Sequence, residues 1–488
     1  MSSYRQIFKS SALFGGTQVI NILIGIVRIK FLAVLLGPTG VGIAGMYQST
    51  TGLIETVAGF GTGRAGVRQI AQALASGDED KIALTSKTLR WVSLASGFLG
   101  MLVVLLFCKP LSWMTFGNNE YVWGVATVSL VLLFNGISAG QIALLQGMRK
   151  LKELAICQIA GALFGSIASI VIVYVWGVQA VAWYLVATAA FGILASWWYA
   201  RKVQIQPSQA STLGMMTEAR GLLKLGFAFM VTGLISAGTI YLSRVLVIRE
   251  LGMAAVGLYT AVITLSSIYV NMVLQAMATD FYPRLTAVTN DHLQVNRMVN
   301  EQTEMGVLMA VPGILGTLTL APWVLELFYS PAFASAASVI QWQLMGVGLC
   351  VISWPVGMIM VAKGMSSFLI FTEIVIATIK ITLLAVGMKM WGLEGAGISF
   401  LIAYVVHTVV VYLIAKKTTG FGWSRRSLFI IVGACAVIAA VFSAIRLLPL
   451  FAGTVLSSVI TLATTAGCFF AMKKMLGFVI FKNKRDVQ

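Results

Sequence analysis

The feature that most constrains this chain is a series of apolar stretches, each long enough to cross a lipid bilayer. About 20 apolar residues span the hydrocarbon core as a helix, and residues 20–37 (INILIGIVRIKFLAVLLG) form one such stretch. Of all 488 residues, 59% are hydrophobic and only 10% are charged, whereas a soluble domain carries about 25% charged residues. We therefore expect an all-α polytopic membrane protein.

Hydropathy and the breaks between apolar stretches predict fourteen transmembrane helices. They are placed near residues 10–36, 42–62, 88–108, 121–146, 153–175, 178–200, 222–248, 253–280, 304–328, 334–361, 366–388, 392–415, 428–446 and 452–474. The longest connections, residues 201–221 and 281–303, are too short for a soluble domain. This argues against an enzyme with an extramembrane active site. It also disfavours a membrane polymerase or glycosyltransferase with a large outward loop.

The distribution of basic residues predicts the orientation. The net charge is +18, with 34 Lys and Arg residues. If the N-terminus is cytoplasmic, 26 of these 34 lie near the termini and the even-numbered connections, and four lie near the odd-numbered ones. This asymmetry follows the positive-inside rule, so both termini are expected in the cytoplasm. Anionic lipid is a sufficient partner for the basic tail FKNKRDVQ, and no nucleic acid is implied.

The chain repeats itself at an offset of about 215 residues. Trp176-Gly177 aligns with Trp391-Gly392, and LGPTGVG (36–42) aligns with LGMAAVG (251–257). The offset spans six predicted helices, so the two halves share one orientation, as parallel repeats do. We therefore expect two six-helix lobes and two extra helices.

The predicted domains are residues 1–220, residues 221–420, and residues 421–488 with the basic tail. A duplicated helical bundle is typical of a transporter whose cavity opens alternately to each side. A static scaffold is the alternative reading of the duplication.

Polar residues form stripes on several predicted spans. Gln18, Asn21 and Arg28 follow helical spacing on the first span, and Asn271 and Gln275 extend a row of hydroxyl residues on the eighth. Small polar residues also serve as packing contacts between membrane helices. Charged residues inside spans more often face a wet cavity. The stripes are therefore candidate cavity walls.

Three basic residues inside the spans are the candidate substrate-binding cations. Arg28 and Arg244 lie at nearly equivalent positions of the repeat, and Lys30 lies beside Arg28. For Lys30 the alternatives are snorkelling to the interface or pairing with Glu55. Because arginine keeps its charge and binds phosphate through two hydrogen bonds, a diphosphate is the expected ligand.

Other intramembrane ionisable residues are candidates for ion coupling. Glu373 and Lys380 lie seven residues apart on one helical face, where they form either a coupling pair or a structural ion pair. His407 is either a proton carrier or a hydrogen-bonded interior residue. Glu55 belongs to the same group. H⁺ or another ion is the expected coupling species, and no cofactor is expected.

One apparent motif fails on context, and two other kinds of site have no matching sequence. GTGRAG (61–66) matches a dinucleotide fingerprint but closes a membrane span instead of following a strand, so it is expected to form a sharp helix exit. The five cysteines and two histidines have no metal-ligand spacing, so no metal site is expected. No ATP-binding loop sequence is present, so a gradient or substrate consumption must drive any transport.

Several segments carry a family resemblance. IKFLAVLLGPTGVGIAGMYQ (29–48), ATDFYPRLTAV (278–288), IQWQLMGVG (340–348) and MVAKGMSSFLIFTEI (360–374) are similar, in order and spacing, to Wzx-type O-antigen and polysaccharide repeat-unit flippases. These belong to the multidrug/oligosaccharidyl-lipid/polysaccharide (MOP) superfamily. The resemblance covers about residues 1–420 and is nearest to the enterobacterial common antigen branch.

The resemblance implies a V-shaped bundle in the bacterial inner membrane that is not an enzyme. It implies outward flipping of an undecaprenyl-diphosphate oligosaccharide by alternating access, with a cationic central cavity. Carried over onto matching segments, that cavity includes Lys30 and Arg244. Polymerase and chain-length proteins of the same pathway are the implied partners. The alternatives are a peptidoglycan-precursor flippase and a cation-coupled drug antiporter of the same superfamily.

Overall fold

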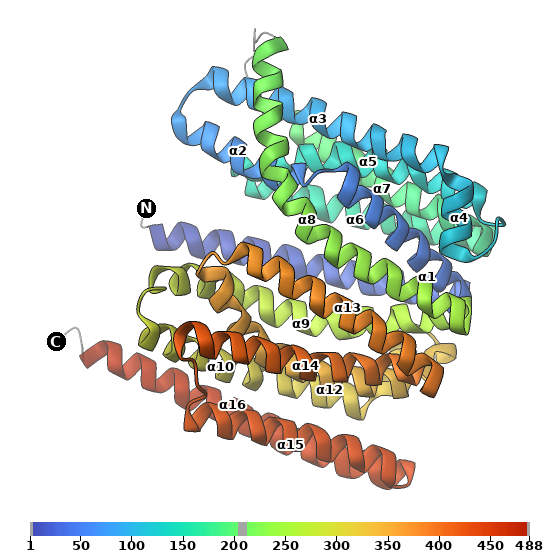
Figure 1. Cartoon of the computed structure of the whole chain (residues 1–488). Helices are drawn as coiled ribbons and strands as arrows, with labels where there is room; N and C mark the ends of the chain where they lie inside the picture. Colours follow the sequence, from blue (N-terminus) through green and yellow to red (C-terminus); the bar gives the residue numbers. More distant parts are fainter. Residues whose placement is uncertain (1–2, 204–211, 486–488) are drawn as a thin grey trace. The chain divides into compact units, whose positions relative to one another are not determined.

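The computed structural model describes the backbone of residues 3–203 and 212–485, and in this part of the chain every element is a helix, with no strand. The helices are α1 (Ser3–Ala58), α2 (Thr62–Ser76), α3 (Glu79–Leu106), α4 (Cys108–Phe116), α5 (Val122–Gly147), α6 (Leu151–Trp176), η1 (Gly177–Ala180), α7 (Val181–Ala200), α8 (Thr212–Leu251), α9 (Met253–Ala287), α10 (His292–Thr319), α11 (Ala321–Phe328), η2 (Pro331–Ala336), α12 (Ala337–Ala362), α13 (Ser366–Trp391), α14 (Glu394–Thr419), α15 (Arg425–Leu447) and α16 (Leu450–Arg485) (Figure 1). The predicted all-α fold is confirmed.

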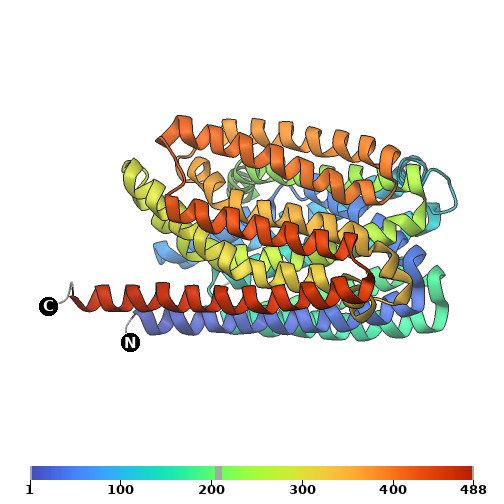
Figure 2. The same cartoon turned by 90° about the horizontal axis from the view of Figure 1, so that it is seen from below.

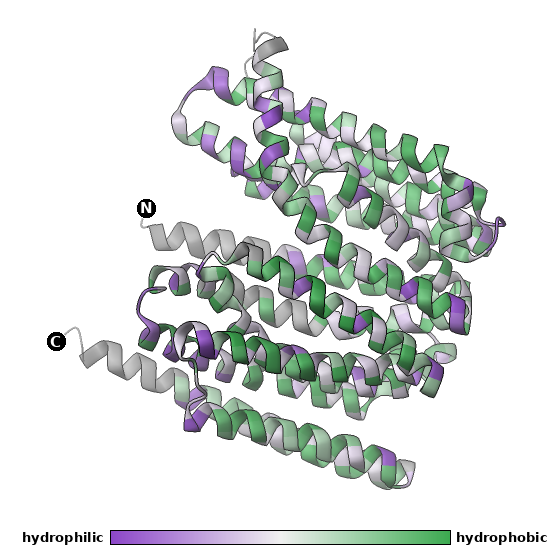
Figure 3. Cartoon of the chain, in the orientation of Figure 1, coloured by the Kyte–Doolittle hydropathy of each residue, from purple (hydrophilic) through white to green (hydrophobic). Residues whose placement is uncertain are grey.

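Within the described residues, ten helical segments are long and apolar enough to cross a membrane, and eleven if the bent pair α10–α11 counts as one span. Two of these segments, Gly16–Ala58 and Leu151–Ala200, are long enough to contain two predicted spans each. Apolar residues cover much of α13 to α15, and hydrophilic residues gather near the turn between α14 and α15 (Figure 3). The chain is a multi-pass membrane protein, and the number fourteen stays a prediction.

The break in the first long segment lies at Gly37. Its backbone (φ 63°, ψ −173°) leaves the helical region, so α1 consists of two helices on either side of this residue. A positive φ is cheap for glycine because it lacks a Cβ atom. Pro38 then starts the second helix, where its missing N–H costs nothing. The sequence LGP therefore separates two helices.

The helix exit predicted at GTGRAG is confirmed. Phe60 and Gly61 both have positive φ values of 45° and 61°, and the amphipathic α2 begins at Thr62. A non-glycine residue rarely adopts a positive φ, which marks this exit as sharply bent. The segment has no strand before it, so the dinucleotide reading fails in the structure as well.

Compact contacts divide the chain into two units. Unit 1 consists of Met1–Gly257 and Phe328–Ser330, and unit 2 consists of Leu258–Leu327 and Pro331–Gln488. Unit 1 therefore contains α1 to α8, and unit 2 contains nearly all of α9 and the later helices. This division into units does not test the predicted parallel repeat with lobes 1–220 and 221–420, which stays a prediction.

Hydrogen bonds tie α8 to the other helices of unit 1. The Thr85 hydroxyl donates to the Glu218 carboxylate at 3.0 Å, and the Thr115 and Tyr241 hydroxyls lie 3.0 Å apart. At the far end of α8, Arg249 donates to the carbonyl of Trp113 at 2.6 Å. These bonds to α3 and α4 explain why α8 is grouped with the helices that precede it.

Glycines allow close helix packing in unit 1. A Cβ atom at Gly161 of α6 would lie 3.4 Å from the Cα of Gly192 in α7, and one at Gly165 would lie 3.3 Å from the Cα of Thr188. Small residues at this spacing let membrane helices approach each other and gain van der Waals contact. Gly161 and Gly165 therefore allow the close approach of α6 and α7.

Unit 2 is built around α12 and α14, which pack along their length through small residues. A Cβ at Gly397 of α14 would meet the carbonyl of Val339 in α12 at 2.5 Å. Helices α15 and α16 lie side by side in this unit (Figures 1 and 2). The Thr319 and Thr461 hydroxyls, 3.1 Å apart, join α10 to α16.

Three residues of α10, which we name the α10 clasp, hold the turn between α14 and α15. The clasp consists of Asn296, Asn300 and Glu304, spaced four apart on one helical face. Asn296 donates to the Thr419 carbonyl at 3.1 Å, and Asn300 accepts from the Ser424 backbone N–H at 2.8 Å.

Glu304, the third clasp residue, is 5% exposed. It accepts a hydrogen bond from the Ser427 hydroxyl at 2.6 Å and pairs with Arg426 at 3.3 Å. The clasp therefore joins the end of α14 and the start of α15 to α10.

Candidate functional site

The polar stripe predicted on the first span lies on the first half of α1. Gln18 is exposed, and Asn21, Arg28 and Lys30 are half-buried. The side-chain oxygen of Asn21 is buried and has no hydrogen-bond partner among the described residues. A buried polar atom without a partner is uncommon. It is typical of a surface that receives water or a ligand.

Arg28 is the cation of this stripe whose surroundings are best described. Its guanidinium forms no hydrogen bond or ion pair with any residue in the described ranges. It lies close enough to the Tyr184 hydroxyl of α7 for an electrostatic interaction. Because guanidinium carries five N–H donors in a planar fork, most of its hydrogen-bonding capacity is available to a ligand.

Arg244 has a different environment. It is 9% exposed, and its Nη1 donates to the carbonyl oxygen of Gly45, in the second half of α1, at 2.6 Å. None of the contacts described for Arg244 joins it to Arg28. The described contact of Arg244 supports a role in holding α8 against α1, and its predicted place beside Arg28 in one substrate site stays a prediction.

Glu55 lies in the second half of α1 and faces α5. Its carboxylate accepts a hydrogen bond from the Asn135 amide at 3.2 Å. This partner was not anticipated from sequence, because the two residues are 80 positions apart. The pairing satisfies one acceptor of a half-buried carboxylate within unit 1.

A second polar cluster lies in unit 2, between α13 and α14. The Lys380 ammonium lies 4.7 Å from the ring centroid of Tyr404, and the rings of Tyr404 and His407 meet edge to face at 5.6 Å. The Nδ1 atom of His407 is buried and has no hydrogen-bond partner among the described residues. An ammonium over an aromatic face is stabilised by the ring quadrupole.

Glu373 does not join this cluster through an ion pair. Its side chain is exposed, and the described residues contain no ion pair between Glu373 and Lys380. Cys350 of α12 lies near both Lys380 and Tyr404. The structure thus brings Lys380 and His407 together through Tyr404, a residue that the sequence analysis did not single out.

Asn271 and Gln275, the candidates on α9, have side chains outside the described part of the structure. Their predicted contribution to substrate binding stays a prediction. No group of three or more His, Cys, Asp or Glu residues that could hold a metal ion is found among the described residues.

Comparisons with known proteins identify what the chain resembles. A family model described as "Polysaccharide biosynthesis protein" matches residues 31–338. The lipid III flippase of Escherichia coli (strain K12) is 24% identical over 403 residues, which is 82% of this chain and 95% of that protein. A protein of the same name from Shigella flexneri matches to the same extent.

Solved structures share the fold. An inward-facing MATE family multidrug resistance transporter of the MOP superfamily has a TM-score of 0.64 at 14% identity, covering 82% of this chain and 94% of that one. The lipid II flippase MurJ in an inward closed conformation has a TM-score of 0.64 at 11% identity, covering 96% and 99%. The predicted MOP-type helical fold is therefore confirmed.

Proposed function

Because the chain belongs to the polysaccharide biosynthesis protein family, we propose that it flips an undecaprenyl-diphosphate-linked oligosaccharide repeat unit across the bacterial inner membrane. The direction is from the cytoplasmic to the periplasmic leaflet. The chain is a transporter and not an enzyme, in keeping with the flippases and transporters that it matches. The lipid III flippase of E. coli supports a lipid-linked oligosaccharide as the substrate class.

The observation that carries the proposal is the half-buried Arg28 on an apolar helix, without a hydrogen-bond partner among the described residues. A charge at such a position costs about 2.5–3.5 kcal/mol on insertion scales. A diphosphate offsets this cost, because guanidinium–phosphate hydrogen bonds are charge-assisted and often paired. Lys30 adds a second cation nearby, and Gln18 and Asn21 offer amides to the first sugars.

The mechanism that we propose is alternating access. The diphosphate binds the cations of α1 while the prenyl chain stays in lipid, and the sugars cross along a wet path. No bond is made or broken. The termini are placed in the cytoplasm, as the basic residues predict, and polymerase and chain-length proteins of the same pathway are the proposed partners.

Proton coupling is assigned to the cluster of Lys380 and His407 in unit 2, with Glu55 and Glu373 as further candidates. Lys380 lies over the Tyr404 ring and is close enough to Glu373 for an electrostatic interaction, but it forms no ion pair with a carboxylate among the described residues. We expect His407→Gln to weaken the response of flipping to a pH gradient and to keep most flipping without one. Flipping measured with and without a gradient checks this, and an unchanged response would contradict it.

The experiment that tests the function is flipping in proteoliposomes. Vesicles are loaded with undecaprenyl-diphosphate oligosaccharide, and headgroup accessibility to an external reagent is followed over time. One charge-assisted hydrogen bond contributes about 1.5–3 kcal/mol, so Arg28→Ala should slow flipping by roughly 10- to 150-fold. Arg28→Lys should recover part of the rate. The matched control is Arg90→Ala, which removes an exposed arginine of α3.

If the wild type flips substrate and Arg28→Ala flips it as fast as the Arg90→Ala control does, Arg28 does not belong to the site. No flipping by the wild type would contradict the proposed function itself. A parallel reaction with an undecaprenyl diphosphate that carries a peptide-bearing disaccharide separates the oligosaccharide substrate from a peptidoglycan precursor.

A further inference from the structure

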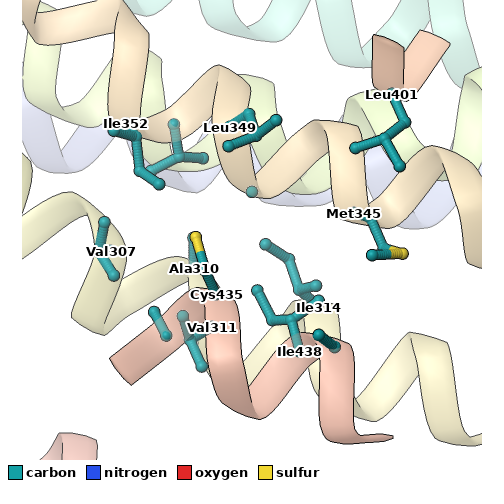
Figure 4. Close-up of a pocket in the computed structure, with 14 residues that line it drawn as sticks. Val307, Ala310, Val311, Ile314, Met345, Leu349, Ile352, Leu401, Cys435 and Ile438 are labelled. Carbon is teal, nitrogen blue, oxygen red and sulfur yellow. The ribbon is translucent and has the colours of Figure 1, made fainter. Parts of the chain in front are cut away.

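Unit 2 contains a cavity between α15 and the three helices α10, α12 and α14. Its volume is about 240 Å³. The side chains that face it carry only carbon and the sulfur atoms of Met345 and Cys435 (Figure 4). Ile352 and Leu349 of α12 lie on one side of it, and Ile438 of α15 lies on another (Figure 4). The proposed flipping mechanism does not use this cavity.

Water is a poor occupant of this cavity. A buried water needs two to four polar partners, and engineered apolar cavities of about 150 Å³ stay dry and bind small hydrocarbons instead. The cavity lies within apolar membrane-spanning helices, where the surrounding medium is lipid hydrocarbon. Cys435 and Ala439, which line one side, are exposed on the outer surface of α15, so lipid chains reach the cavity from there.

Polar contacts fix both ends of α15 on either side of the cavity. At one end Glu304 of the α10 clasp binds Ser427 and Arg426. At the other end Arg446 forms an ion pair with Glu394, which also accepts a hydrogen bond from the Trp342 indole at 2.6 Å. Both ends of α15 are therefore fixed by polar contacts, and in the middle Ile438 packs close to Gly348 of α12 beside the cavity.

A cluster of cations lies at the start of α15. Lys416 and Lys417 close α14, Arg425 and Arg426 open α15, and all four are exposed. Basic residues of this kind beside membrane helices bind anionic lipid headgroups. Cys435 follows Arg425 by ten residues, which is about 15 Å along a helix. That distance is about half the thickness of the hydrocarbon core, or one leaflet.

We propose that unit 2 binds one anionic phospholipid, with its phosphate at the α14–α15 turn and one acyl chain in the cavity under α15. The depth of the cavity fits an acyl chain that starts at this headgroup site. A neutral lipid lacks the headgroup interaction, and a free anion lacks the chain. The bound lipid fills the space between α15 and the core of unit 2.

The test uses the full-length protein in phosphatidylethanolamine vesicles. They contain a small fraction of phosphatidylglycerol with a diazirine on its acyl chain, or of phosphatidylcholine with the same chain. After irradiation, mass spectrometry locates the crosslinked residues. We expect phosphatidylglycerol crosslinks on residues 434–439 of α15, at least fivefold above those of phosphatidylcholine.

Two pairs of variants test the two parts of the site. Ala310→Leu fills the cavity and should abolish these crosslinks, whereas Val432→Leu, on the exposed face of α15, should leave them unchanged. Arg425→Gln should lower them about fivefold, whereas Lys389→Gln, at the end of α13, should not. If Ala310→Leu does not fold, Cys435→Phe, at the outer side of the cavity, replaces it as the variant that fills the cavity.

Three outcomes would overturn the proposal. Equal labelling by phosphatidylcholine would remove the headgroup site. Labelling that persists after the cavity is filled would place the acyl chain elsewhere. Labelling of the same residues by a photoreactive undecaprenyl diphosphate but not by phosphatidylglycerol would assign the cavity to the prenyl chain.

Discussion

The two arginines predicted as substrate ligands differ in their described contacts, and replacing each with methionine separates structure from function. Methionine keeps most of the aliphatic volume and removes the guanidinium. Arg244 is 9% exposed and donates to Gly45 at 2.6 Å. A hydrogen bond from a charged group contributes about 1.5–3 kcal/mol net. We therefore expect Arg244→Met to lower the free energy of unfolding by about that amount.

Arg28→Met should not lower the free energy of unfolding, because Arg28 forms no hydrogen bond with a described residue and its half-buried charge is itself costly. It should nevertheless slow flipping strongly. Unfolding is followed by circular dichroism as SDS is titrated into mixed micelles, and flipping is followed in proteoliposomes made from the same preparations.

One result would refute this reasoning. If Arg244→Met unfolds at the wild-type mole fraction of SDS but no longer flips substrate, Arg244 contacts substrate and its bond to Gly45 contributes little. Conversely, a large loss of stability in Arg28→Met would show that Arg28 is a structural residue.

Two further predictions concern helix contacts. Gly257→Ala should be destabilised by about 1–3 kcal/mol, because its Cβ would lie 1.8 Å from the Pro38 carbonyl oxygen. The control is Gly316→Ala, whose Cβ would meet nothing within 4 Å, and it should be at least as stable as the wild type in the same SDS titration. Glu304→Ala should cost about 1–3 kcal/mol by leaving the buried Ser427 hydroxyl without its acceptor. Glu304→Gln keeps an acceptor and should cost less than half as much, and equal losses in thermal unfolding would contradict this.

The sequence by itself determined the class of the protein. Apolar stretches of about 20 residues leave a chain few options in a bilayer, because every backbone polar group must be satisfied within a helix. The breaks between helices could also be predicted, because they depend on the residues at the break itself. Gly37 adopts a positive φ before Pro38, and Phe60-Gly61 ends the second half of α1. The family resemblance could be recognised from segments that occur in the same order and spacing along the chain, and the family model matches residues 31–338.

Only the tertiary structure decided how the polar residues are partnered. Arg28 and Arg244 look equivalent in sequence, yet Arg244 bonds to a carbonyl of α1 while Arg28 has no such described bond. Lys380 lies over Tyr404, a residue of another helix, and pairs with no carboxylate in the described part of the chain.

Helical spacing shows which residues share a face, but it does not show which helix that face meets. Partners such as Glu55 and Asn135, 80 residues apart, are chosen by helix packing. The cavity under α15 has the same origin, because four helices that are far apart in the sequence contribute the side chains that line it.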